Sequence, residues 1–216
     1  MKKNNISEKV AKILLEIKGI TLNPKKPYRY ASGILSPVYT DCRILMAYPK
    51  HRKFIRNLYI KNLLSNGKFN LIAATATAGI PHGAWISDKM NLPMVYVRGN
   101  AKDHGKGNQI EGLVKKGQKT AVIEDLISTG SSSTTTADAV RKAGGKVSRI
   151  FSIFTYKMKA ADKNFEKNKL KLITLTDFPT VVKVAEKIGY INKKDKALIL
   201  EWTKNPITWG KKMGFE

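Results

Sequence analysis

Two adjacent carboxylates followed by a hydroxylated loop form the stretch of the sequence best suited to chemistry. The apolar run Val122-Ile123 ends in Glu124 and Asp125. The residues that follow are Leu126, Ile127, Ser128, Thr129, Gly130, Ser131 and Ser132. Carboxylates accept hydrogen bonds from a vicinal diol, so the acidic pair suits two hydroxyls of a ribose. Hydroxyls and backbone N–H groups at the start of a helix suit a phosphate. The stretch therefore predicts a cradle for a ribose 5-phosphate.

A purely structural interpretation of this stretch stays open, because Ser, Thr and Gly after a strand also form ordinary helix N-caps. The position favours binding, since ligands of open α/β sheets lie at the carboxyl ends of the strands. Two glycine-rich alternatives fail on spacing. The segment from Gly99 to Gly107 does not have the spacing or the final Ser or Thr of a Walker loop, and it does not extend to G-x-G-x-x-G.

A second candidate is the basic, glycine-rich segment from Tyr96 to Gly112, which carries Arg98, Lys102 and His104. These side chains can donate to an anionic leaving group, and such stabilisation is largest where water is excluded. The glycines would allow the segment to open and close as a lid. Composition alone favours an ordinary exposed basic loop, so the functional interpretation depends on the cradle beside it.

The elements that would position these groups alternate between short apolar runs and helical patterns. Strands are expected at 71–74, 94–97, 120–123, 150–154 and 172–175, and helices at 80–90 and 132–143. Strands that alternate with helices predict a mostly parallel sheet covered on both faces. The predicted fold class is therefore α/β.

The two ends of the chain lie outside this alternation. Apolar residues at 10, 13, 14 and 17 share one face of a helix that stops near Gly19, and a second helix is expected from about 50 to 66. Residues 23–40 are typical of a loop or short strands. We expect one domain, 1–216, with a core at about 46–177 and a small cap made of about 1–45 plus 178–216.

The composition narrows the classes of function. The 40 Lys and Arg against 16 Asp and Glu give a net charge of +24, which attracts anions. No aromatic residues are interleaved with the basic runs, so a nucleic-acid partner is not favoured. No apolar stretch is long enough to span a membrane, and no secretion signal is recognisable. The single cysteine, Cys42, indicates neither a disulfide framework nor a zinc site, and a reducing cytoplasm fits best.

Residues 122–132 resemble the motif with which type I phosphoribosyltransferases bind phosphoribosyl pyrophosphate (PRPP). Residues 96–112 are similar to the mobile catalytic loop of one branch, the orotate phosphoribosyltransferases. Weaker matches at 75–80 and 201–206 extend the resemblance over nearly the whole chain. The resemblance implies the type I phosphoribosyltransferase fold. It also implies transfer of the phosphoribosyl group from PRPP to orotate, which gives orotidine 5′-phosphate and pyrophosphate in pyrimidine biosynthesis.

The resemblance also implies roles for particular residues. Arg98, Lys102 and His104 match loop positions that contact pyrophosphate in the neighbouring subunit, so a homodimer with shared active sites is expected. Residues 124–132 match the PRPP cradle. Ser128 also matches a position that touches orotate, and Tyr39 matches an aromatic position that covers the base, although an ordinary core tyrosine is an equal alternative. Mg²⁺ is expected as a cofactor held mainly through the pyrophosphate of PRPP.

The sequence departs from many family members at Ala31, Ala78 and Gly99, where those proteins have Lys, and Arg29 or Lys106 are candidates to compensate. Two other functions stay open. The first is transfer to a purine or another base, because the cradle is common to all phosphoribosyltransferases. The second is a PRPP-sensing regulator that binds nucleic acid. The basic lid argues against both.

Overall fold

The computed structural model describes residues 3–30, 32–99 and 109–215. Its centre is a seven-stranded sheet in the order β11-β10-β8-β5-β6-β7, with β9 also paired to β10. The strands are β5 (Leu71–Thr75), β6 (Met94–Val97), β7 (Ile110–Glu111), β8 (Lys119–Ile123), β9 (Leu126–Ile127), β10 (Lys146–Thr155) and β11 (Lys171–Asp177). All pairs are parallel except β6 with β7. The mostly parallel α/β sheet predicted from the sequence is confirmed.

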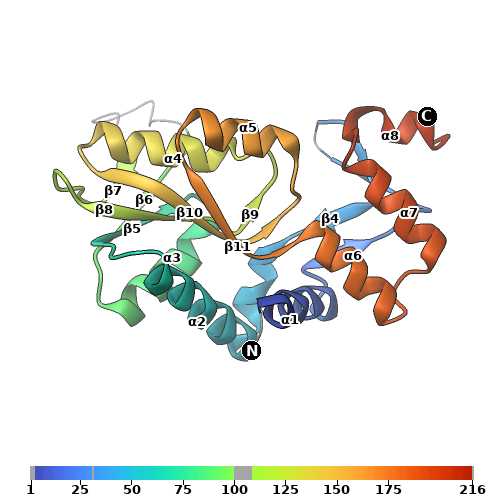
Figure 1. The fold of residues 1–216 in the computed structure, drawn as a ribbon, viewed down its shortest axis with the longest axis horizontal. Helices are drawn as coiled ribbons and strands as arrows, with labels where there is room; N and C mark the ends of the chain where they lie inside the picture. Colours follow the sequence, from blue (N-terminus) through green and yellow to red (C-terminus); the bar gives the residue numbers. More distant parts are fainter. Residues whose placement is uncertain (1–2, 31, 100–108, 216) are drawn as a thin grey trace.

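Helices cover both faces of this sheet, as Figure 1 shows, with α2 and α3 on one face and α4 and α5 on the other. The helices of this part are α1 (Lys3–Glu16), α2 (Pro49–Ser65), α3 (Gly79–Met90), α4 (Ser131–Lys142) and α5 (Lys159–Lys167). Apolar side chains form a separate buried cluster on each face. Each of β5, β8 and β10 contributes to both clusters, which explains why their sequences are apolar without alternation.

The remaining elements form a smaller unit beside the sheet (Figure 1). Its elements are β1 (Ile20–Leu22), β2 (Tyr28–Arg29), β3 (Leu35–Ser36), β4 (Val38–Thr40), the 3₁₀ helix η1 (Cys42–Ala47), α6 (Phe178–Lys187), α7 (Lys193–Trp202) and α8 (Pro206–Lys212). Its strands form two antiparallel pairs, β1 with β4 and β2 with β3, and β3 packs against α8. Trp202 is only 1% exposed, and its indole N–H donates to the Leu35 carbonyl at 3.1 Å. This contact ties the two ends of the chain together.

The elements predicted from the sequence lie close to those observed, whereas β7 and α5 were not predicted, and two further differences involve β10. The strand expected at 150–154 begins earlier, at Lys146, because residues 146–149 also pair with β8. Leu126 and Ile127, expected in a loop, form β9 because their backbone pairs with Phe154 and Thr155 of β10. Neither addition could be inferred from apolar periodicity, since both depend on the neighbouring strand.

His82 lies in the first turn of α3 and is buried between two aromatic rings. Its ring centroid is 6.1 Å from that of Tyr59 and 5.4 Å from that of Trp85. Burial disfavours the charged imidazolium and lowers the pKa of His82 to about 4, from an ordinary value of 6.5. His82 is therefore a neutral core residue near neutral pH, in agreement with a structural role.

Acidification should destabilise the fold through His82. Between pH 6.5 and 4 the unfolded chain binds this proton and the folded chain does not, so the stability present above pH 6.5 is lost as the pH falls. The free energy of unfolding should drop by about 3 kcal/mol across this window because of His82 alone. Urea denaturation of the wild type and of His82→Gln, compared at each pH, isolates the contribution of His82 to the free energy of unfolding. Equal pH dependence in the two proteins would contradict the assignment.

Candidate active site

The acidic pair predicted from the sequence lies at the carboxyl end of β8. Glu124 and Asp125 are 6% and 5% exposed. One carboxylate oxygen of Glu124 accepts the backbone N–H of Asp125 at 3.1 Å, and the other accepts the hydroxyl of Ser133 at 3.3 Å. Burial raises the pKa of both carboxyls, and the charge of Asp125 raises that of Glu124 further. Such a pair favours a ligand that brings hydrogen-bond donors or a cation.

Hydrogen bonds from distant elements hold the backbone of this pair. The Tyr59 hydroxyl, on α2, donates to the Glu124 carbonyl at 2.6 Å. The Asp125 carbonyl accepts the backbone N–H groups of Ile153 and Phe154 at 3.0 and 3.2 Å. Both acceptors are buried, so their partners are needed for stability. The carboxylates therefore stand on a backbone segment that α2 and β10 fix on either side.

The hydroxylated loop continues from β9 into the first turn of α4. Gly130 is the residue before the helix and has φ of +76°, the left-handed region that favours glycine. A Cβ there would lie 2.5 Å from the ring of Phe165. No side chain caps the N-terminus of α4, so the N–H groups of its first turn are available to an anion. Thr129 is held by Asn164, whose side chain donates to its carbonyl at 3.3 Å.

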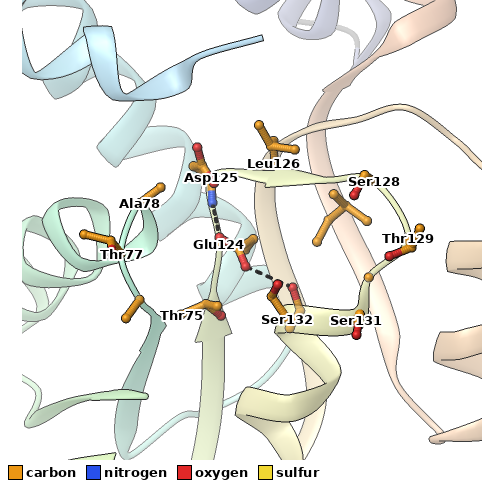
Figure 2. A pocket seen from close by; sticks show the side chains of 14 residues that line it. Thr75, Thr77, Ala78, Glu124, Asp125, Leu126, Ser128, Thr129, Ser131 and Ser132 are labelled. Atoms are coloured by element: carbon orange, nitrogen blue, oxygen red, sulfur yellow. Dashed lines mark hydrogen bonds between the residues drawn. The ribbon is translucent and has the colours of Figure 1, made fainter. Parts of the chain in front are cut away.

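A cavity of about 210 Å³ joins these groups. Figure 2 shows the acidic pair between the hydroxylated loop on one side and the segment with Thr77 and Ala78 on the other. That second wall comes from the turn between β5 and α3. Gly79 lets it approach closely, because a Cβ there would lie 2.6 Å from the Ile123 carbonyl oxygen. Parallel strands thus bring two turns together at one edge of the sheet.

All nine residues predicted for the cradle, 124–132, line this cavity. The other predicted residues are more scattered. Arg98 follows β6 and contacts Glu111, with 3.5 Å between its guanidinium and the carboxylate. Tyr39 is 44% exposed on β4, and its ring lies 5.7 Å from that of Tyr28. Lys102 and His104 fall outside the described residues. Ser133 and Tyr59 were not predicted; Ser133 continues the hydroxylated run by one residue, whereas no local pattern marks Tyr59.

This strand order, with an acidic pair and a hydroxylated loop after one central strand, defines the class of type I phosphoribosyltransferases. Solved structures show the same fold. Leishmania donovani UMP synthase matches with a TM-score of 0.77 and 25% identity over 93% of this chain and 43% of that one. The orotate phosphoribosyltransferase of Aeropyrum pernix matches with a TM-score of 0.72 and 23% identity over 85% of this chain and 99% of that one.

Sequence relatives identify the branch. A protein of Listeria innocua named orotate phosphoribosyltransferase is 49% identical over 96% of this chain and 100% of its own length. Proteins of the same name from Enterococcus faecalis and Coxiella burnetii are 48% and 45% identical over 95% of this chain and 99% of theirs. No protein-family model matches the chain. The chain belongs to the orotate phosphoribosyltransferase family, and the predicted family and fold are confirmed.

Removing the Tyr59 hydroxyl should destabilise the backbone segment that carries the acidic pair. Tyr59→Phe keeps the ring but leaves the buried Glu124 carbonyl without its donor, which should lower the free energy of unfolding by about 1–3 kcal/mol. Chemical denaturation measures this loss. Tyr190→Phe, which removes a hydroxyl from an exposed tyrosine, is the matched control and should cost far less. Equal effects of the two substitutions would show that the bond to Glu124 contributes nothing.

Proposed function

We propose that the chain transfers the 5-phosphoribosyl group of PRPP to orotate, giving orotidine 5′-phosphate and pyrophosphate in pyrimidine biosynthesis. The observation that carries the proposal is the cavity at the carboxyl edge of the sheet. It combines a buried acidic pair with the uncapped N-terminus of α4, and family membership supplies the reaction. A ribose carrying a 5-phosphate matches both ends of that cavity.

Within this proposal, different cradle residues bind the ribose and the phosphate of the ligand. Glu124 and Asp125 accept the ribose 2′- and 3′-hydroxyls, which supply the donors that two buried carboxylates need. The phosphate lies against residues 126–132, where the first turn of α4 presents backbone N–H groups and the positive end of its dipole. These contacts orient C1 of the ribose and restrict its motion before the bond to pyrophosphate breaks.

The leaving pyrophosphate is assigned to Arg98, Lys102 and His104. Charge grows on it as the C1–oxygen bond breaks, so fixed donors lower the barrier more than they strengthen substrate binding. Among the described residues, Arg98 does not line the cavity of its own chain. Its contact with Glu111 keeps it at the edge of the sheet beside β7. This arrangement supports a homodimer in which each subunit lends its lid to the other.

Tyr39 and Ser128 are assigned to orotate. Ser128 lines the cavity beside the acidic pair. The ring of Tyr39 makes a tilted contact with the ring of Tyr28, and the residue is 44% exposed. Part of the Tyr39 ring is therefore free to cover a flat base. A planar pyrimidine could then lie between the small unit that carries β4 and the carboxyl edge of the sheet.

Mg²⁺ is the expected cofactor, and the residues present fit an ion that arrives with its substrate. Among the described residues no three His, Cys, Asp or Glu side chains gather to hold a metal, whereas Glu124 and Asp125 offer the hard oxygens that Mg²⁺ prefers. The ion would be held mainly through the pyrophosphate of PRPP, with the two carboxylates nearby. When bound, Mg²⁺ would offset part of the charge of the pyrophosphate.

We also propose that the chain forms one domain over 1–216, with a core at about 46–177 and a cap from the two ends. The contact of Trp202 with Leu35 supports a cap built from both ends. A cytoplasmic location is proposed from the buried, unpaired Cys42. No helix in the described ranges is long and apolar enough to cross a membrane.

Base selectivity tests the reaction. With PRPP and Mg²⁺ the protein should consume orotate and leave hypoxanthine, adenine and uracil largely untouched, because the lid residues match the orotate branch. The loss of orotate absorbance, and product chromatography for the other bases, measure this. A purine turned over as fast as orotate would overturn the base assignment.

Subunit mixing tests the shared site. Lys102→Ala should lower kcat by about a hundredfold or more with little change in PRPP affinity, since its contact forms chiefly in the transition state. Asp125→Asn should damage the cradle of its own chain. In a heterodimer of the two variants, one site receives an intact lid and an intact cradle. Activity should therefore reappear, to about a quarter of the wild-type value after random exchange at equal ratio.

The control is a chain that carries both substitutions, mixed with the Lys102→Ala variant, in which no site has both parts. That mixture should stay inactive. Native mass spectrometry of isotope-labelled subunits reports whether exchange has occurred. If heterodimers of the two single variants form and remain inactive, the lid serves its own subunit and the shared site is wrong, while the orotate assay still decides the reaction.

A further inference from the structure

A second cavity lies at the opposite edge of the sheet from the active site. Its volume is about 540 Å³, and five of the residues that line it are basic: Lys68, Lys119, Arg141, Lys146 and Arg149. None of the lining residues is acidic, and none belongs to the catalytic cavity. Lys119 and Lys146 begin β8 and β10, so this cavity is at the amino ends of the strands whose carboxyl ends carry the cradle.

Strand register places three of these cations on one face of the sheet. Lys119 is directly opposite Lys146. The register then shifts between Val147 and Arg149, so that Arg149 lies opposite Ala121. Side chains alternate along a strand, and Lys119 therefore shares a face with Ala121. Without this bulge, Arg149 would point to the other face of the sheet. The bulge between Val147 and Arg149 thus places the Arg149 side chain on the same face of the sheet as Lys119 and Lys146.

The arrangement is electrostatically unfavourable without a partner. Like charges directly opposite each other on neighbouring strands are destabilising, and the sheet has two such pairs here, Lys119 with Lys146 and Arg149 with Lys171. Within the described part of the chain, none of these four residues forms an ion pair, whereas other cations, such as Arg141 and Lys196, do. A bound anion would relieve this repulsion.

The two arginines of the cavity show that the basic groups differ in role. Arg141 is fully engaged, because its guanidinium donates to the carbonyls of Val147 and Asn168 and contacts Asp138. The buried Nε of Arg149 has no acceptor among the described residues. A buried donor without a partner costs free energy, and a small shift of the Arg149 side chain toward a ligand acceptor in the cavity would relieve that cost.

The walls leave room beside Arg149. Gly67, which connects α2 to β5, has no side chain, and the nearest atom to a Cβ built there would be the Arg149 Nη1, at 3.9 Å. Phe69 lines the cavity and packs edge-on against Phe151 at 5.6 Å. The volume is in the range of small-molecule sites, about 300–1,000 Å³. A guanidinium and two ammonium groups beside an aromatic wall fit a compact, highly charged anion.

We propose that this cavity binds the polyphosphate group of a small anion, either a nucleoside triphosphate or inorganic polyphosphate. Arg149 and the opposed pair Lys119 and Lys146 hold the phosphates, and Lys68 adds charge at the rim. The limited size of this open cavity and the convergence of the cations on one face favour a small ligand over nucleic acid, which would need a longer basic track. The site is separate from the catalytic cavity and does not depend on the reaction assigned there.

Glycine-selective ¹⁵N labelling provides a test that reads both cavities at once. Gly67 and Gly145 line the basic cavity, whereas Gly130 lines the catalytic one. Titration with inorganic tripolyphosphate should shift the Gly67 and Gly145 amide signals to saturation, and Gly130 should respond with its own midpoint. Raising the salt concentration should weaken the response at Gly67, because the interaction is ionic.

The variant is Lys119→Ala/Lys146→Ala, which should weaken the response at Gly67 and Gly145 by at least about tenfold and leave that at Gly130 unchanged. Lys193→Ala/Lys194→Ala is the matched control, since it removes the same charge from the exposed start of α7. It should leave all three responses unchanged. Arg149→Gln, which keeps a long polar side chain, should weaken the Gly67 response without affecting Gly130.

Two further titrations identify the source of the phosphates. Tighter binding of a nucleoside triphosphate than of tripolyphosphate would show that the wall at Phe69 recognises the nucleoside, and equal binding would show that polyphosphate alone is the ligand. The proposal fails if tripolyphosphate gives no saturating shift at Gly67 and Gly145, or if the control variant weakens it as much as the lysine pair does. It also fails if only a single-stranded oligonucleotide produces saturation.

Discussion

The burial of two neighbouring carboxylates at the end of β8 is the constraint on which the rest of the structure depends. A charge buried without a partner costs several kcal/mol, and in the described part of the chain neither Glu124 nor Asp125 forms an ion pair. The Ser133 hydroxyl and the backbone N–H of Asp125 donate to the Glu124 carboxylate, while Tyr59 and the backbone of β10 hold the peptide carbonyls of the pair. Those groups can reach the pair only if α2, α4 and β10 occupy their observed positions, so the acidic pair and the fold around it support each other.

Local patterns in the sequence were sufficient for the cradle and insufficient for what supports it. Apolar runs and helix periodicity located the main strands of the sheet and α4, and the residue types at 124–132 indicated the ligand. The bond from Tyr59 to Glu124 joins residues 65 positions apart, and nothing near Tyr59 distinguishes it from a core tyrosine. The bulge before Arg149 is equally invisible, because it depends on how β10 pairs with β8. Both are tertiary features.

The position of Tyr39 also depends on contacts that no local pattern reveals. It lies on β4 between Val38 and Thr40, and both neighbours are tied to aromatic residues. The Tyr30 hydroxyl donates to the Val38 carbonyl at 2.7 Å, and the Tyr156 hydroxyl donates to the Thr40 side chain at 2.9 Å. Tyr156 directly follows β10. The strand that carries Tyr39 is thus fixed to the same edge of the sheet that carries the cradle.

The direction of the helices explains why the two edges of the sheet differ in charge. In parallel β-α units the positive helix ends lie at the carboxyl edge, where they favour anions, and the negative ends lie at the amino edge, where they favour cations. Lysines after α2 and α4, such as Lys68 and Lys146, are favoured by this effect alone. It does not account for Lys119, which begins a strand and directly opposes Lys146, or for the unpaired Nε of Arg149. Helix dipoles therefore explain the presence of cations at this edge, and the proposed anion would explain why three of them converge.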